Sequence, residues 1–207
     1  MDRHDPQGWG QEEYPESLEG YFLISETELM DPNFFRTVVL ILQHNEDGAF
    51  GLVVNRQAEA SLADALPQFE GTEAGELPIY VGGPVEQQYL FVLRTPSSHL
   101  QNSENALSPV QGVTFEPATE PLIEFLQDEW PAMPESERLA IRLYAGCAGW
   151  GPGQLENELE QGAWIVHPAT SEIVFYPNPT EGWEAALRKK GGLYKIIAQT
   201  GYKPSMN

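Results

Sequence analysis

The segment with the clearest capacity for chemistry runs from Gly146 to Gly153, after an apolar run and before a helical pattern. A strand, a glycine loop and a helix N-terminus can together hold a phosphate group through backbone N–H groups. The spacing does not match the phosphate-binding fingerprints, because Gln154 stands where a glycine or alanine is needed and Pro152 removes one N–H donor. We therefore interpret the segment as a tight structural turn around Trp150, with anion binding as the alternative.

The cysteine and the histidines give little support for nucleophilic catalysis or metal binding. Cys147 is the only cysteine, and it follows an apolar run among small residues, which is typical of a buried core thiol. His44 and His167 are the candidate bases, and the sequence places neither beside Cys147. The four histidines are dispersed, and no Gly-x-Ser-x-Gly elbow occurs. We predict no catalytic residue, no bound metal and no cofactor, with a reactive Cys147 as the alternative.

Three acidic residues alternate along the helical pattern that follows the glycines. They are Glu156, Glu158 and Glu160, and alternate positions on a helix point in different directions. Leu155 and Leu159 form the apolar stripe of this helix. We therefore expect the three acids to face solvent.

The charge of the chain bounds the kinds of partner it can have. It carries 31 acidic and 11 basic residues, a formal net charge of −20, which repels polyanions. Nucleic acid and anionic membrane surfaces are therefore disfavoured partners. From Ala185 to Asn207, by contrast, the sequence has five basic residues and no acid. We expect a solvated helix end and tail there, with docking of an acidic partner as the alternative.

Length and cysteine content indicate one domain in a reducing compartment. A chain of 207 residues can be organised around one hydrophobic core, and a single cysteine excludes an internal disulfide. The first ten residues contain no apolar leader, and the longest aliphatic run, Val38 to Leu42, is far too short to span a membrane. We expect a soluble cytoplasmic protein with no membrane partner.

Local patterns predict the elements that position these residues. The clearest is a hairpin, because two β-branched apolar runs flank an Asp-Gly pair that favours a tight turn. The predicted strands lie at 20–24, 37–43, 49–55, 77–81, 89–94, 112–115, 138–144, 162–167 and 173–176. Helical segments are predicted at 31–35, 61–66, 119–126, 154–161 and 181–190.

The order of these elements favours a mixed sheet with helices packed around it. Strands come partly as hairpins and partly beside helices, which does not fit a regular alternation of strand and helix. The polar stretch 95–111 is predicted to be a surface loop. We expect a flexible acidic arm at 1–17, a single folded domain at 18–199 and a tail at 200–207.

Three segments, in their order and spacing, resemble the YqgE/AlgH family of bacterial proteins. They are RTVVLILQHNEDGAFGLVVNR at 36–56, YVGGPV at 80–85 and AGWGPGQLENELEQGAW at 148–164. Two positions depart from the family: Gln57 stands where proline is usual and Cys147 where an aromatic residue is common, which argues against a catalytic thiol. The resemblance covers about residues 19–197. It implies an α+β fold in which a mixed, bifurcated β-sheet curls into a pseudo-barrel with surrounding helices.

The resemblance implies little about activity, because no biochemical function is established for the family. One branch is named for regulation of alginate production and has been described as a transcriptional regulator. This chain has no helix-turn-helix pattern, and its charge opposes DNA binding. We therefore predict a non-enzymatic binding or regulatory protein that acts through a protein or small-molecule partner.

The predicted binding surface is built from the segments that match the family. Arg56, at the end of the hairpin's second strand, draws the most interest, although simple exposure to solvent is the alternative for it. The candidate residues are His44, Asn45, Asn55, Arg56, Gly82, Gly83, Trp150 and Gln154. Two other functions stay open: an enzyme acting on a small metabolite, such as a phosphorylated one, at 146–153, and nucleic-acid binding through the basic C-terminal segment.

Overall fold

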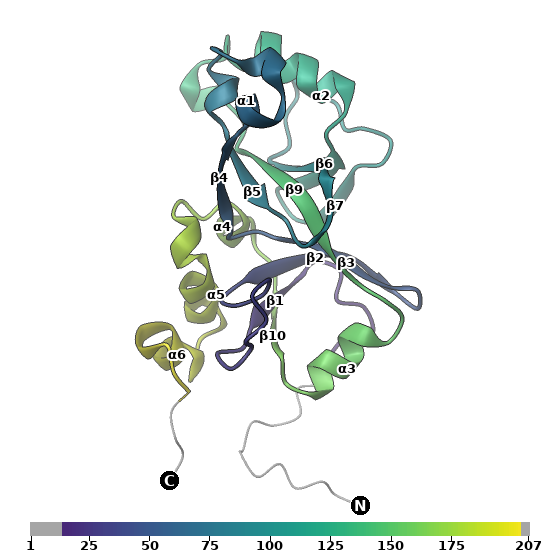
Figure 1. Cartoon of the computed structure of the whole chain (residues 1–207), viewed down its shortest axis with the longest axis vertical. Coiled ribbons are helices and arrows are strands. Elements are labelled where there is room, and N and C mark those ends of the chain that lie inside the picture. Colours follow the sequence, from purple (N-terminus) through teal and green to yellow (C-terminus); the bar gives the residue numbers. More distant parts are fainter. Residues whose placement is uncertain (1–13, 204–207) are drawn as a thin grey trace, which may run out of the picture.

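A strongly bent sheet runs through the whole molecule in the computed structural model, which describes residues 14–203 (Figure 1). Its strands are β1 Tyr21–Ser25, β2 Val38–Asn45, β3 Gly48–Val53, β4 Gln57–Ser61, β5 Pro78–Val81, β6 Val85–Arg94, β7 Leu107–Val110, β8 Val113–Pro117, β9 Ile141–Trp150 and β10 Trp164–Pro168. The α-helices are α1 Leu62–Ala65, α2 Glu120–Glu124, α3 Gln154–Glu160, α4 Ser171–Val174, α5 Gly182–Lys190 and α6 Tyr194–Thr200. Short 3-10 turns add Pro67–Phe69, Ala74–Glu76, Glu135–Glu137 and Pro179–Glu181, and a π-helical turn, Phe125–Glu129, continues α2.

The sheet forks at β9, which crosses the molecule from its upper to its lower half (Figure 1). The first half of β9 lies between β5, its one parallel neighbour, and the antiparallel β6. Its second half leaves β5 and pairs with β3 of the lower hairpin through Ala148, Gly149 and Trp150. The lower branch continues through β2, β1 and β10, and the upper branch through β6, β8 and β7.

Glycines make this fork possible because two stretches of backbone touch there. A Cβ on Gly82 would lie 2.2 Å from the carbonyl oxygen of Gly146, and a Cβ on Gly83 would lie 2.1 Å from that of Cys147. Gly82 also joins both branches, since its N–H donates to Ala145 and its carbonyl accepts from Val53. Only glycine allows backbones to approach so closely.

Three apolar clusters fill the space around the bent sheet. The upper cluster packs α1 and α2 against β6 and β9, and the lower cluster packs α3 against β2, β3 and β10. The third cluster lies between them and includes the buried face of α5, with Trp183 at its centre. Figure 1 shows the helices distributed around the two ends and one side of the sheet. The predicted α+β fold, a mixed bifurcated sheet curled into a pseudo-barrel with surrounding helices, is confirmed.

Most locally encoded elements form where the sequence predicts them. The hairpin closes with Asn45 opposite Gly48, and the positive φ of Gly48, +125°, lets the turn approach Trp150. Helix α1 begins after Ser61, whose backbone and hydroxyl both donate to the Asp64 carboxylate. The predicted helix over 181–190 also forms, and it ends at Gly191, where φ is +84°.

The glycine-rich segment is the main error of the sequence-based prediction. Residues Ala145 to Trp150 were expected to form a loop, and they continue β9 as a strand. Pairing with β3 holds residues 148–150 in the sheet, while Gly146, whose φ is +72°, allows an irregularity in β9 where Gly82 approaches it. The turn is reduced to residues 151–153, so the expected order of strand, glycine turn and helix forms, but with a much shorter loop.

Other differences arise from contacts that are distant in sequence. The expected strand at 173–176 is instead the end of α4, because the buried guanidinium of Arg142 binds the carbonyls of Val174 and Tyr176 and caps that helix. The expected single helical turn at 31–35 does form, since the N–H groups of Phe34 and Phe35 both donate to the carbonyl of Asp31. Strands β4 and β7 and helix α6 were not predicted, and β7 lies within the expected surface loop.

Two further expectations concern the ends of the chain and the presence of a membrane-spanning helix. Most of the predicted arm, and the last four residues of the predicted tail, lie outside the described residues. Among the described residues no helix is long and apolar enough to cross a membrane.

Candidate functional site

His44 joins the hairpin to α3 and to the chain before β1. Its side chain is 6% exposed; Nδ1 accepts a hydrogen bond from the backbone N–H of Leu18 at 3.0 Å, and Nε2 lies 2.7 Å from Oε1 of Glu156. The backbone N–H of Glu156 and the His44 imidazole lower the pKa of this carboxyl group. Asn45, the next residue, accepts from the N–H of Asp47 within the turn. Both ring nitrogens of His44 therefore have partners inside the protein.

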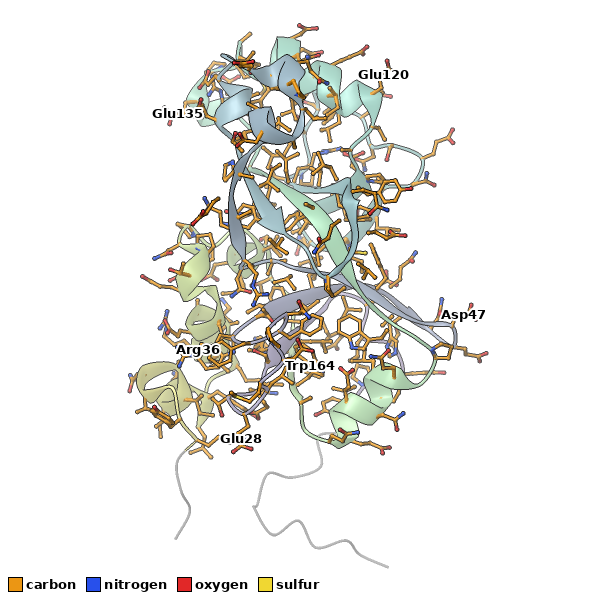
Figure 2. All side chains as sticks on the ribbon, viewed as in Figure 1. Glu28, Arg36, Asp47, Glu120, Glu135 and Trp164 are labelled. Carbon is orange, nitrogen blue, oxygen red and sulfur yellow. The ribbon has the colours of Figure 1, made fainter. Side chains whose placement is uncertain are left out.

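Trp150 and Gln154 belong to a second set of internal contacts, centred on Glu158. One carboxylate oxygen of Glu158 accepts from the indole N–H groups of Trp150 and Trp164, at 2.9 and 2.8 Å (Trp164 is labelled in Figure 2). The other oxygen accepts from the side-chain amide of Gln154 at 3.0 Å. Glu158 was expected to face solvent; it is instead half-buried and holds α3 against the sheet.

Asn55 and Arg56, which follow the C-terminal end of β3, also form hydrogen bonds that hold neighbouring segments of the chain together. Asn55 bridges two segments, accepting from the N–H of Val38 at 2.8 Å and donating to the carbonyl of Arg36 at 3.0 Å. The guanidinium of Arg56 donates to the carbonyls of Pro32, Asn33 and Phe35 and thereby caps the turn at 31–35. Burial lowers the pKa of Arg56, while Asp31 acts in the opposite direction.

The eight sequence-predicted residues do not converge on one cavity. His44, Trp150 and Gln154 gather around α3, whereas Arg56 and Gly83 line a cavity of about 20 Å³ with Gln87 of β6. Such a space holds one water molecule and no metabolite. The two groups are linked through the β3–β9 pairing and through the 31–36 turn, where Phe34 stacks on Trp150 with the ring centroids 6.0 Å apart. Whether these residues bind a partner stays a prediction, and the contacts that the structure gives them stabilise the fold.

Cys147 lies at the fork of the sheet, and its thiol is buried at 3% exposure. Burial, and to a smaller extent the negative charge of Glu86, raise the pKa of this thiol to about 11. A nucleophilic cysteine needs the opposite shift, so the surroundings of Cys147 suppress the thiolate. No cluster of three or more metal-ligating side chains occurs between residues 14 and 203.

The basic C-terminal segment is partly neutralised by its own molecule. Lys189 pairs with Glu172 at 2.6 Å, and Lys203 pairs with Glu26 at 3.1 Å. The amino group of Lys190 donates to the carbonyl of Val166. The docking of an acidic partner on this segment stays a prediction. The positive electrostatic potential of the segment is weaker than its sequence suggests.

A feature that the sequence did not reveal is an open groove of about 630 Å³ beside the first half of β6. It lies between the end of α1, β6 and α2, in the upper part of Figure 1. Its lining consists of Leu66, Gln68, Glu86, Gln88, Tyr89, Leu90, Phe91, Pro117, Ala118 and Ile123. The volume falls within the range of ligand-binding pockets.

The groove is apolar at its floor and polar at its rim. Tyr89 is 55% exposed, which is unusual for a large aromatic side chain, and Phe91 beneath it is buried. Glu86 is the one charged lining residue, and the amides of Gln68 and Gln88 add neutral hydrogen-bonding groups. The available signal in the sequence was the polar run VEQQY directly after Gly-Gly-Pro, but the residues opposite it come from distant segments.

Comparison with known proteins places this architecture among relatives. The family model DUF179, AlgH-like, matches residues 22–195. UPF0301 proteins from Nitrosococcus oceani and Thioalkalivibrio sulfidiphilus are 36% and 35% identical over 188 and 181 residues; the first alignment covers 88% of this chain and 95% of the relative, and the second 86% and 91%.

Two solved structures have similar folds. The solution structure of AlgH from Pseudomonas aeruginosa aligns with a TM-score of 0.68 and 31% identity, covering 95% of this chain and 100% of that one. A crystal structure of a Corynebacterium diphtheriae protein aligns with a TM-score of 0.70 over 90% of this chain and 94% of that one, at 24% identity, and supports the fold alone. From its sequence and its fold together, this chain belongs to the AlgH-like family.

Proposed function

We propose that this protein is a non-enzymatic binding protein whose site is the groove beside β6. The observation that carries the proposal is the composition of the lining, in which an apolar floor meets two side-chain amides and the single carboxylate of Glu86. Apolar surface with a few well-placed polar groups is the usual composition of a binding site. Acyl or phosphoryl transfer would in addition need a nucleophile and a base aimed at one point, and the lining residues do not include such a pair.

Any regulatory effect then passes through the molecule that the groove binds. A net charge of −20 repels nucleic-acid phosphates, so direct DNA contact is disfavoured. A ligand in the groove contacts β6 and α2 together, and these elements also contribute to the upper core. Binding there stabilises the upper half of the molecule.

A fluorinated fragment library, screened by NMR against the full chain, tests this proposal. Fragments are expected to compete for one site and to bind Tyr89→Ser about tenfold more weakly, because the largest exposed contact of the groove is lost. Tyr202→Ser is the matched control, since Tyr202 is also exposed, at 77%, and does not line the groove. Fragments that bind both variants as they bind the unmodified chain, or a library without hits, would contradict the proposal.

A further inference from the structure

The register of β6 leaves residues 86–89 without a ladder partner at the groove, in a bulge opposite Gly146. Strand β8 pairs with β6 only from Phe91 to Arg94, and the bond from Ala118 N–H to the Leu90 carbonyl is its last contact. Toward β9, the ladder shifts between Val85 and Leu90. Among the described strands, none supplies a paired residue for 86–89, although this stretch belongs to β6.

This unpaired stretch is exposed to solvent. All four side chains from Glu86 to Tyr89 are exposed, and Val85 before them is 44% exposed. The stretch contains neither lysine nor proline, but the bulge, the charge of Glu86 and the preceding Pro84 limit regular pairing with a second copy of this edge. A hydrophobic groove beside a free strand edge is the arrangement that accepts an added strand.

The backbone of Glu86 is strained where the bulge begins. Its φ is +53°, and Arg36 is the one other non-glycine residue with a positive φ in the described chain. A left-handed glutamate costs about 1–3 kcal/mol, and such strain is concentrated at binding and catalytic sites. Here it lies at the point where β6 departs from the β9 ladder and enters the groove.

The charge around the groove specifies the kind of strand that fits. Glu86 lines it, no basic residue does, and Glu120 and Glu124 are exposed on the helix that carries Ile123. Glu120 projects outward from α2 in Figure 2. Glu86 at the rim, with Glu120 and Glu124 on the neighbouring helix and an apolar floor, complements a segment in which apolar residues alternate with lysine or arginine.

We propose that the groove binds an extended cationic segment of a partner protein, which adds as a strand to β6 at Glu86–Tyr89. The inference rests on the proposed function and names its ligand class. Main-chain hydrogen bonds to β6 supply affinity, every second side chain of the added segment enters the groove, and its cationic residues meet Glu86.

Selection of a displayed random-peptide library against the full chain tests this inference. The selected peptides should alternate apolar with basic residues. Methylation of alternate backbone nitrogens in a selected peptide should lower affinity about tenfold or more, while methylation of the intervening ones should be tolerated, because only every second N–H of an added strand faces its neighbour. Hydrogen exchange should slow at the amides of Glu86–Tyr89.

Two charge variants test the contribution of Glu86. Glu86→Gln should weaken the selected peptides about three- to tenfold, since a charged partner is lost at the rim. Glu135→Gln removes the same charge from an exposed position outside the groove and should leave affinity unchanged (Figure 2). Equal effects of the two variants would contradict a specific contact with Glu86.

The outcomes separate this inference from the proposed function. Peptides that lose affinity in Tyr89→Ser but show no periodic effect of N-methylation and no slowed exchange would overturn strand addition and leave the groove as a binding site. Fragment hits in the groove without any selected peptide would have the same meaning. Peptides that bind Tyr89→Ser and the unmodified chain equally would overturn both.

Discussion

At the scale of the residue, the polar side chains that the sequence offers for chemistry serve mainly to hold distant segments together. Glu158 is the clearest case, because one carboxylate satisfies the indole groups of two buried tryptophans. The helical pattern around it suggested only a solvent-facing acid, since the tryptophans come from β9 and β10 and their positions could not be read locally. The types and spacing of residues in the sequence therefore draw attention to Glu158, but they do not reveal which groups it binds.

Glu158→Ala should lower the free energy of unfolding by about 2–4 kcal/mol, because it leaves two buried donors without an acceptor. Urea unfolding followed by tryptophan fluorescence measures the loss. Glu160→Ala is the matched control, as Glu160 is exposed on the same helix, and its effect should stay within about 0.5 kcal/mol. Equal losses in the two variants would show that the carboxylate bridge contributes nothing.

The thiol of Cys147 gives a second residue-scale prediction, this one about pH. Its pKa of about 11 means that alkylation by iodoacetamide near pH 8 should be about 100-fold slower, or more, than in the urea-unfolded chain, where the thiol titrates near 8.5. The folded state holds this proton more tightly, so the thiol's contribution to stability is present below the ordinary pKa and is lost as the pH rises toward 11. Similar rates in the two states would contradict a suppressed thiolate, and a faster rate in the folded state would indicate an activated nucleophile.

At the scale of the element, the fork of the sheet depends on backbone contact. Gly83→Ala should lower the free energy of unfolding by about 3 kcal/mol or more, because its φ is +156° and a Cβ would lie 2.1 Å from the Cys147 carbonyl oxygen. Gly151→Ala should change it by less than about 1 kcal/mol, since nothing lies within 4 Å of a Cβ there. Paired urea unfolding curves measure both effects, and a tolerated Gly83→Ala would show that the crossing can relax.

Elements encoded by neighbouring residues could be predicted, and those imposed from a distance could not. The Asp-Gly turn and the start of α1 at Ser61 are local signals, and both elements form as expected. The glycine-rich end of β9 looks like a loop in the sequence, because β3, which pairs with residues 148–150, lies about 100 residues earlier in the chain. The groove was missed for the same reason, since Leu66, Tyr89 and Ile123 meet only after folding.

At the scale of the whole molecule, the net charge of −20 should set the kinetics of partner binding. A cationic peptide is attracted from a distance, so its association rate constant should fall about tenfold from low to physiological salt, while its dissociation rate constant changes little. Stopped-flow fluorescence with a labelled peptide measures both constants. A salt-independent association rate would show that the overall field does not guide the encounter.

Amide chemical-shift mapping on the isotope-labelled full chain tests the central claim most directly. The ligand should be the tightest fragment or peptide from the screens. We expect the perturbed amides to cluster at Leu66, at 86–91 of β6 and from Ala118 to Ile123, the segments that line the groove. Perturbations centred instead on the 151–154 turn and the hairpin tip would show that ligands bind the sequence-predicted surface. That result would contradict a binding site in the groove.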